Sequence, residues 1–540
     1  MRDAFTAHPS LTGLYSRPGW NHPGPAMFWL TGLFAWPFRN DAWATRVGAS
    51  MLQLIAVGWL AWVTWRRETA LFLAAAVVTS LTYLSVGPDL FRQPWNLNVP
   101  LPFFVLFLFL AHLAATGSPR QLIAMAAVAS LVAQTHVGYA SLLAVGFVWA
   151  IGMVVVDARR ARRAPQGWRS TVVLTALVLV VLWVPVGVEV VANWPGNLGK
   201  VVSYFALGEH PVLGWDRALR VVAEEFRPVP VWLGGGDRTD LLGHAVGASM
   251  AWLAVPVALI ALAVIANRHR GRVENQRMVL FAAAELAMAL VAVSRVDEPL
   301  AYTFQWRAAL AAFLFVACLW SIWAAFEVAF PGLVRRGAVI GVIAVVAWGC
   351  GVRSFSVVAY STERREPFEN EVGEVMRQLA GRTPRSGSVL VEPVGDVLPT
   401  LFPGVVDELD RAGVAVKVGS ARVFGAHRAV ARDTGVRRWL VMERGSLVSS
   451  YVRDGAQVLA WVSPLSQAED RELTRLQDQL RRQLVAGGHD AMTEWLDSQS
   501  VAFLLAGIPG LDPLVVRRAG ELNAKVGPNS CHCAVVEVQS

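Results

Sequence analysis

The stretch Tyr15-Ser16-Arg17-Pro18-Gly19-Trp20-Asn21-His22-Pro23-Gly24-Pro25 is polar and aromatic, and it leads directly into an apolar segment at residues 26–38. Proline removes backbone donors and restricts the residue before it, so no helix runs through this first loop. Residues 26–38 are too few to cross a bilayer. A rigid polar loop before a short apolar segment indicates a site held at a membrane surface. The alternative interpretation is an irregular surface loop.

Composition is typical of a polytopic membrane protein rather than a soluble domain. Of the 540 residues, 55% are hydrophobic and only 16% are charged. The formal net charge of +8 comes almost entirely from arginine. In a membrane protein this indicates cytoplasmic loops, not binding to nucleic acid. Four cysteines are too few for a disulfide framework, and Cys531-His532-Cys533 offers half a metal site with no second ligand pair, so we interpret it as a strand end.

Hydrophobic runs of sufficient length predict ten membrane-spanning helices. They cover residues 43–65, 70–86, 99–117, 121–135, 137–156, 171–192, 249–267, 278–295, 305–329 and 338–355. The run at 121–135 is short for a span, so it is either tilted or partly re-entrant.

Arginine placement predicts the orientation of these helices, because short cytoplasmic loops carry the excess of positive charge. The arginines of alternate loops fall on one side: Arg66, Arg67, Arg120, Arg159, Arg160, Arg162, Arg163, Arg169, Arg268, Arg270, Arg272, Arg277, Arg335 and Arg336. We assign that side to the cytoplasm, which places both termini outside. An outside start needs a helix to translocate it, so we expect a further transmembrane helix upstream of Met1. Insertion of residues 26–38 as a hairpin is the alternative, and their length argues against it.

The opposite, outward side collects polar residues in irregular segments. They lie in residues 87–98, in the connection Gln134–Tyr139, around Glu189 and Asn197, and between Arg295 and Arg307. Polar groups at membrane depth are costly and are functional hypotheses by default, with interfacial capping as the alternative. The long outer loop 193–248 also contains an amphipathic helix, predicted over Leu213–Phe226, that suits the membrane interface.

Three regions follow from these patterns: a first outer loop with its juxtamembrane segment (1–42), a transmembrane domain (43–355) and a C-terminal domain (356–540). The last region alternates helices and strands and predicts a compact α/β domain outside the membrane. We expect helices over 367–379, 399–412 and 467–485, and strands over 388–392, 414–418, 438–442 and 534–538.

The first loop also carries a family resemblance. Ser16-Arg17-Pro18-Gly19-Trp20-Asn21-His22-Pro23-Gly24-Pro25-Ala26-Met27-Phe28-Trp29, with Ala44-Thr45-Arg46-Val47 in the next helix, resembles the GT-C glycosyltransferase superfamily. Within that superfamily, the sequence most resembles actinobacterial proteins of the arabinofuranosyl- and mannosyltransferase type and glycosyltransferase family 39. Pro94-Trp95-Asn96, Gln134-Thr135-His136-Val137-Gly138-Tyr139 and the segment from Gly196-Asn197 to Tyr204-Phe205 resemble further motifs of this group. The resemblance covers about residues 3–355.

This resemblance implies a multi-pass enzyme of the cytoplasmic membrane. It would transfer a sugar from a polyprenyl-phosphate donor to a glycan or lipid acceptor at the outer face, with inversion assisted by a carboxylate base. Family members keep the base in the first outer loop, where Asp3 is the one carboxylate before Asp41. The alternative is that the usual acidic residue lies upstream of Met1. No metal motif is present, whereas some relatives use a divalent cation.

The same resemblance and the chemistry of the outer segments suggest a set of substrate-binding residues. It comprises Arg17, Trp20, Asn21, His22, Arg92, Trp95, Asn96, His136, Glu189, Asn197, Lys200 and Arg307. We expect Trp20, His22, Trp95, His136 and Arg307 to converge on one outward pocket. A lipid-intermediate transporter or flippase is an alternative, although it predicts paired halves that this sequence does not display. An inactive polysaccharide-binding scaffold is the other alternative.

Overall fold

The computed structural model comprises two compact units, Met1–Val358 and Ala359–Ser540. It describes residues 1–16, 18–38, 42–87, 93–207, 212–230, 232, 247–270, 273–297, 300–329, 341, 369–384, 387–394, 401–419, 424, 426–430, 436–442, 448, 451–452, 454–496, 501–505, 508–526 and 533–538. The predicted span 338–355 therefore lies outside the described residues, apart from Gly341.

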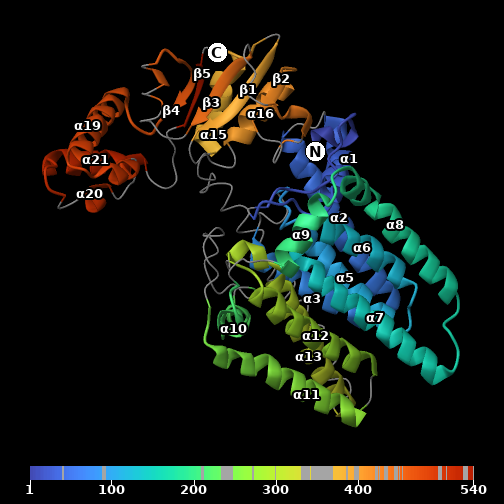
Figure 1. Ribbon diagram of the computed structural model, residues 1–540. Coiled ribbons are helices and arrows are strands. Elements are labelled where there is room, and N and C mark those ends of the chain that lie inside the picture. Colours follow the sequence, from blue (N-terminus) through green and yellow to red (C-terminus); the bar gives the residue numbers. More distant parts are fainter. Residues whose placement is uncertain are drawn as a thin grey trace. The chain divides into compact units, whose positions relative to one another are not determined.

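The first unit is a bundle of helices (Figure 1). Its long helices are α2 (Ala42–Arg67), α3 (Thr69–Val86), α5 (Pro100–Ala115), α6 (Gln121–Thr135), α7 (Ala140–Ala161), α8 (Trp168–Ala192), α11 (Ala254–Arg270), α12 (Val273–Ser294) and α13 (Trp306–Ala329). Seven of the predicted spans coincide with helices of sufficient length and apolarity to cross a membrane. The segments 99–117 and 121–135 form the shorter helices α5 and α6.

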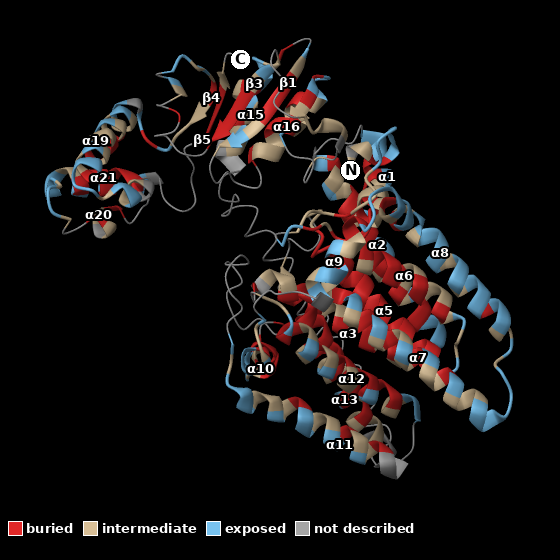
Figure 2. Ribbon diagram, in the orientation of Figure 1, coloured by how far each residue is buried: buried red, intermediate tan, exposed pale blue. Residues whose placement is uncertain are grey.

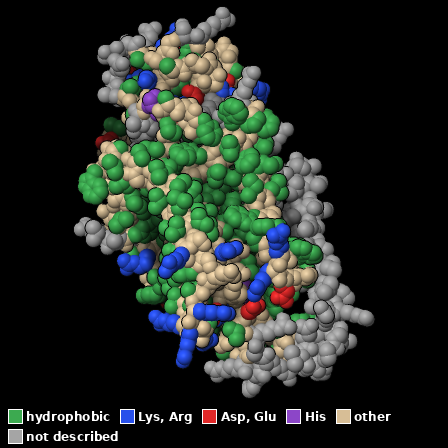
Figure 3. Space-filling model, turned by 90° about the vertical axis from the view of Figure 1, so that its right-hand side faces the viewer, with side chains coloured by type: hydrophobic (Ala, Val, Ile, Leu, Met, Phe, Trp, Pro, Cys, Tyr) green, Lys and Arg blue, Asp and Glu red, His purple; other side chains and the backbone are tan. Residues whose placement is uncertain are grey.

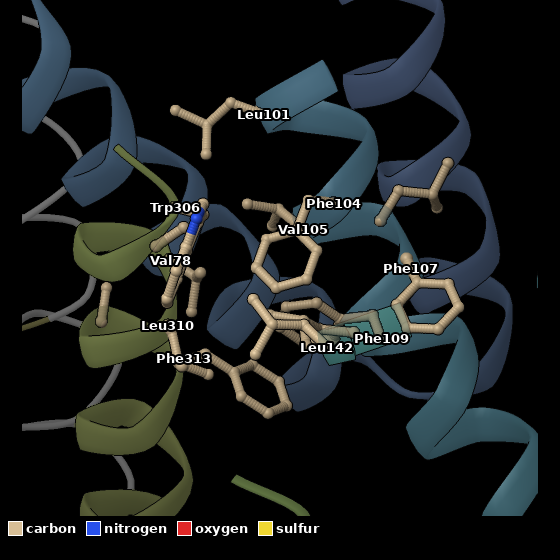
Figure 4. Packing of buried hydrophobic residues seen from close by; sticks show 14 of the residues in the cluster. Val78, Leu101, Phe104, Val105, Phe107, Phe109, Leu142, Trp306, Leu310 and Phe313 are labelled. Atoms are coloured by element: carbon tan, nitrogen blue, oxygen red, sulfur yellow. The ribbon is translucent and has the colours of Figure 1, made fainter. Parts of the chain in front are cut away.

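Two helices that are apolar all round occupy opposite environments. Every residue of α5 is buried, so this Phe- and Leu-rich helix is the centre of the core. Phe104, Phe107 and Phe109 of α5 pack with Leu142, Leu310, Phe313 and other buried side chains (Figure 4). In contrast, only 17% of the apolar window of α8 is buried (Figure 2). Because an apolar helix that is not covered by protein needs an apolar solvent, α8 is expected to face lipid.

One end of the bundle is tied together by arginine. Arg67, at the end of α2, donates to the carbonyl of Thr116 (2.9 Å) and pairs with Glu274 near the start of α12 (2.8 Å). Arg277 donates to the Ala115 carbonyl and pairs with Asp157 of α7. Figure 3 shows a broad hydrophobic band on one face, with Lys and Arg side chains gathered along one margin.

Because connected helices run in alternate directions, the opposite end of the bundle collects the other helix termini. There lie the N-termini of α5, α7 and α13 and the C-termini of α6, α8 and α12. Short elements join them at this end: η1 (Arg2–Phe5), α1 (Ala26–Ala35), η2 (Trp36–Phe38), η3 (Val137–Tyr139), α9 (Gly196–Leu207), α10 (Trp215–Ala223), η4 (Glu224–Phe226), η6 (Met250–Leu253) and η7 (Ala301–Phe304). Helix α10 with η4 forms most of the amphipathic segment predicted at 213–226, and α9 occupies part of the outer loop 193–248.

The second unit contains a five-stranded sheet in the order β2-β1-β3-β5-β4. Its strands are β1 (Ser388–Val394), β2 (Ala415–Val418), β3 (Arg437–Met442), β4 (Gln457–Val462) and β5 (Cys533–Val538). The β2-β1-β3 pairs are parallel, whereas β5 pairs antiparallel with β3 and β4. Cys533 begins β5, as the strand-end interpretation expects.

Helices complete this unit. They are α15 (Glu369–Ala380), α16 (Leu401–Arg411), α19 (Gln467–Ala486), α20 (Val501–Leu504) and α21 (Pro513–Val526), with the short turns η8 (Ala426–Arg428) and η9 (Asp490–Trp495). Ser466 and Glu469 form a capping box that starts α19. The sequence-based expectation of an α/β domain is confirmed here, although β4, α20 and α21 were not predicted.

Candidate functional site

The first loop folds back on itself as a tight hairpin. Tyr15 and Asn21 form an antiparallel bridge, and the Ser16 N–H donates to the Trp20 carbonyl (2.7 Å). His22 exchanges backbone hydrogen bonds with both neighbours across the hairpin, donating to Leu14 and accepting from Gly13 (2.8 and 2.9 Å). Gly19 has φ +95° at the tip, a conformation that L side chains rarely adopt. The proline- and glycine-rich sequence therefore holds His22 on an ordered backbone.

His22 packs against His136, which lies between α6 and η3. The two ring centroids are 4.5 Å apart and the planes are inclined by 34°. Both side chains are buried, with exposures of 4% and 8%. The predicted proximity of these two histidines is thus confirmed, while their chemical role stays a prediction.

Each imidazole accepts a backbone hydrogen bond at Nδ1. Val137 N–H donates to His22 (3.2 Å), and Gly138 N–H donates to His136 (3.2 Å). An accepting Nδ1 carries no proton, so the proton of the neutral ring is on Nε2. Burial lowers the pKa of His136 to about 4. Burial, followed by the neighbouring His136, lowers the pKa of His22. Each of the two packed rings is therefore neutral at neutral pH, with its one N–H donor at Nε2.

Aromatic side chains form one wall of this pair. Trp20 meets His22 edge-to-face at 5.5 Å, and it also contacts Tyr204 (5.7 Å) and Phe205 (6.0 Å) of α9. On the other side, Tyr139 meets His136 edge-to-face at 5.9 Å. Trp20 is 5% exposed, so its predicted use as an open platform for a sugar would require α9 to move.

The last turn of α8 carries a carboxylate that bonds to the start of α9. Both oxygens of Glu189 accept the backbone N–H of Asn197, at 3.0 and 2.9 Å. The Asn197 side chain in turn bonds both backbone groups of Asn21: it accepts from the N–H and donates to the carbonyl, each at 2.7 Å. The structure thus links three of the predicted site residues, Asn21, Glu189 and Asn197, directly to the hairpin that carries His22.

Gln134, at the end of α6, joins the first loop to α8 by hydrogen bonds. Gln134 accepts from the Gly24 N–H through its backbone carbonyl (3.3 Å) and donates from its side chain to the Leu182 carbonyl of α8 (2.8 Å). A Cβ atom at Gly24 would overlap the Gln134 side-chain amide. Gly24 is therefore needed for close approach of the first loop to the end of α6.

Arg307 belongs to a different cluster at the same end of the bundle. Its guanidinium donates to the Val221 carbonyl, and it pairs with Glu225 (3.5 Å) and Glu224 (3.9 Å). Arg307 is 7% exposed and Glu225 is 2% exposed. Both line a small pocket with Trp306, Phe226 and Leu310. The acidic partners neutralise Arg307, which the sequence prediction of a phosphate-binding role did not foresee.

Four of the remaining predicted residues belong to other segments of the first unit, and two lie outside the described residues. Trp95 packs on Tyr302 at 5.4 Å, and Asn96 is buried beside it in sequence. Lys200 is exposed on α9, and Asp3 lies part-buried in η1, whose contacts are with α1. Arg17 and Arg92 lie outside the described residues. The expected convergence is therefore seen for Trp20, His22 and His136, whereas the contacts of Trp95 and Arg307 are with other partners.

Three residues at this end of the bundle were not predicted from sequence. Tyr204 and Phe205 were quoted in a family-like motif, which was the available signal for their contact with Trp20. Glu225 gave no signal, because its pairing with Arg307 joins segments far apart in the chain. Within the described residues, no three His, Cys, Asp or Glu side chains are grouped as metal ligands.

Comparisons with known proteins address the fold. No protein-family model matches the chain, and no curated protein sequence matches it. A crystal structure of ArnT from Cupriavidus metallidurans bound to undecaprenyl phosphate is 15% identical over 85% of this chain and 90% of that chain, with a TM-score of 0.50. The apo structure of the same protein gives 16% identity over 81% and 85%, with a TM-score of 0.46. The chain thus has an ArnT-like fold: a multi-pass α-helical membrane protein with a small C-terminal sheet domain.

Proposed function

We propose that this protein is a membrane glycosyltransferase that moves a sugar from a polyprenyl-phosphate donor to a glycan or lipid acceptor at the outer face of the cytoplasmic membrane. The observation that carries the proposal is the paired imidazoles of His22 and His136, at the end of the bundle opposite the arginine-rich end. The ArnT-like fold supports it, because that ArnT structure holds undecaprenyl phosphate, a lipid of the proposed donor class.

The proposed reaction is a single displacement. The acceptor hydroxyl oxygen attacks the anomeric carbon, the bond from that carbon to the lipid phosphate breaks, and the phosphate leaves with the bonding electrons. The hydroxyl proton passes to a carboxylate base. The Nε2–H groups of His22 and His136 donate hydrogen bonds to the phosphate as its charge develops. Neutral donors suit this task, since the buried pair needs no compensating carboxylate.

Orientation follows from charge. The arginine-rich ends of α2, α7 and α12 are assigned to the cytoplasm by the positive-inside rule, which puts the imidazole pair at the outer face. The second unit then lies outside as well.

Transfer of labelled sugar in proteoliposomes tests the proposal. Undecaprenyl-phosphate donors that carry mannose or arabinofuranose are supplied with cell-envelope glycan or lipid acceptors, and labelled product is followed. Incorporation that depends on the donor lipid is expected. Transport of the intact lipid-linked sugar without transfer would indicate a flippase instead. Binding of undecaprenyl phosphate alone, measured by native mass spectrometry, separates a missing acceptor from a missing lipid site.

Asp3→Asn tests the identity of the base in the same assay. The Asp3 side chain is part-buried on η1, which packs against α1, whereas the two imidazoles bond to the backbone N–H groups of Val137 and Gly138. We therefore expect a mild loss of turnover. Near-complete loss with unchanged binding of undecaprenyl phosphate would identify Asp3 as the base.

A further inference from the structure

We propose that Asn197 is a positioning residue that acts through His22, with Glu189 holding Asn197 in place. These three residues and Asn21 form a continuous relay from the end of α8, through the start of α9, to the first loop. The inference rests on the proposed role of His22 as a donor to the leaving phosphate. It replaces the expectation, drawn from sequence, that Glu189 and Asn197 bind substrate.

The Asn197 side chain bonds both backbone groups of Asn21, the residue directly before His22. The side-chain oxygen accepts from the Asn21 N–H and the side-chain nitrogen donates to the Asn21 carbonyl. That carbonyl belongs to the peptide bond leading into His22, so its direction sets the plane of the His22 backbone. The side chain of Asn21 is used elsewhere, donating to Thr12 and to the Gly13 carbonyl (both 3.1 Å). Asn197 therefore holds the main chain of Asn21, and we call these two hydrogen bonds the clamp.

Glu189 holds Asn197 by a charged contact. Its two oxygens accept the Asn197 N–H at the N-terminus of α9, where a carboxylate is favoured by the helix dipole and by unsatisfied N–H groups. Gly196 has φ +67°, and a Cβ atom there would lie 2.8 Å from a Glu189 oxygen. Glycine at this position thus permits the approach. Glu189 is 8% exposed and Asn197 7%, so water competes weakly for these bonds.

A second contact joins the same two segments. Trp20, two residues before His22, packs against Tyr204 and Phe205, about two helical turns after Asn197 along α9. Helix α9 is therefore attached to the first loop at its start by polar bonds and further along by aromatic contact. Displacement of α9 is expected to change the direction of the His22 Nε2–H relative to His136.

A double-mutant cycle tests the inference in the full chain. Asn197→Asp keeps the shape of the side chain but turns a carboxylate oxygen toward the Asn21 carbonyl and adds charge beside Glu189. We expect turnover to fall at least about tenfold, because small misplacements of reacting groups are costly. The matched control is Asn193→Asp, at an exposed position with no described side-chain hydrogen bond; its turnover should be unchanged.

The cycle is completed with His22→Ala. If Asn197 acts through His22, Asn197→Asp has little further effect on turnover once His22 is alanine. If the two single-variant losses of turnover multiply fully in the double variant, the inference is wrong and the glycosyltransferase proposal still stands. Glu189→Gln retains an oxygen that accepts the Asn197 N–H and should keep turnover within about threefold, whereas Glu189→Ala should match Asn197→Asp.

Limited chymotrypsin digestion provides a readout that does not depend on activity. Asn197→Asp should expose the bond after Trp20, so the peptide ending at Trp20 should be released several times faster than from the wild type or Asn193→Asp. Equal release rates would show that the clamp does not order the first loop. If the wild type transfers no sugar, the proposed function fails, and digestion still decides whether Asn197 holds the hairpin.

Discussion

His22 and His136 pack in a tilted arrangement with ring centroids 4.5 Å apart, and each ring is oriented by a hydrogen bond that its Nδ1 accepts from a backbone N–H. Val137, which follows His136 directly, supplies the hydrogen bond to His22. The chain segment that carries His136 therefore also orients the His22 ring. A pair arranged in this way presents two neutral donors of fixed direction, and its predicted consequences concern chemistry, pH, folding and orientation.

His22→Ala is expected to lower turnover by on the order of 10²-fold, the typical effect of losing one oriented donor to a developing anion. It also leaves the part-buried Val137 N–H without its acceptor, which costs at most about 1–3 kcal/mol of folding free energy. Turnover per folded molecule and thermal stability should be measured together. His8→Ala, at an exposed position of the same loop, is the control. A loss of activity that merely follows the loss of folded protein would make His22 a structural residue.

Acidification should destabilise the protein through the imidazole pair. His136 stays neutral in the fold down to a pKa of about 4, whereas an unfolded histidine takes up a proton below about pH 6.5. Between these values the unfolded state binds more protons, so stability rises with pH over this window and falls as pH is lowered through it. At pH 5 the loss from His136 is on the order of 1–2 kcal/mol relative to pH 7. The difference in melting temperature between the wild type and His136→Phe should shrink as pH falls from 7 to 5, because the variant lacks the His136 imidazole.

Arg307→Met is expected to destabilise the first unit by about 3–5 kcal/mol, because it leaves the buried Glu225 carboxylate without its cation. Arg307→Met combined with Glu225→Gln should recover a large part of that stability. Detergent-solubilised yield and melting temperature measure both effects. Recovery of sugar transfer in the double variant would show that Arg307 holds η4 in place. Recovery of stability with no transfer would instead return Arg307 to the phosphate site.

Cysteine labelling should report the orientation of the two units. A membrane-impermeant maleimide added to intact cells should modify Asp454→Cys in the second unit and spare Gln166→Cys in the α7–α8 connection, although both positions are exposed. After the cells are opened, both should be labelled. Labelling of Gln166→Cys alone in intact cells would invert the topology and place the imidazole pair in the cytoplasm.

The sequence by itself determined the membrane class and most helix positions, because a bilayer demands about 20 consecutive apolar residues per helix and that demand is local in the chain. The spacing of the arginines likewise marked one end of the bundle, because it also is a local property of the chain. The sequence did not distinguish α5 from α8. Both are apolar all round, and only packing decides that α5 is enclosed by other helices while α8 remains uncovered.

The candidate residues were found in the sequence because polar, proline-bound segments are unusual beside membrane helices, yet their grouping was decided only in three dimensions. Glu189, Asn197 and Asn21 come from two regions of the chain, and their hydrogen bonds exist because α9 lies on the first loop. Arg307 was expected beside His22, but its buried charge is met by Glu225 instead. Pairing across long sequence separations depends on which helix ends the core brings together, and residue spacing alone contains no record of that choice.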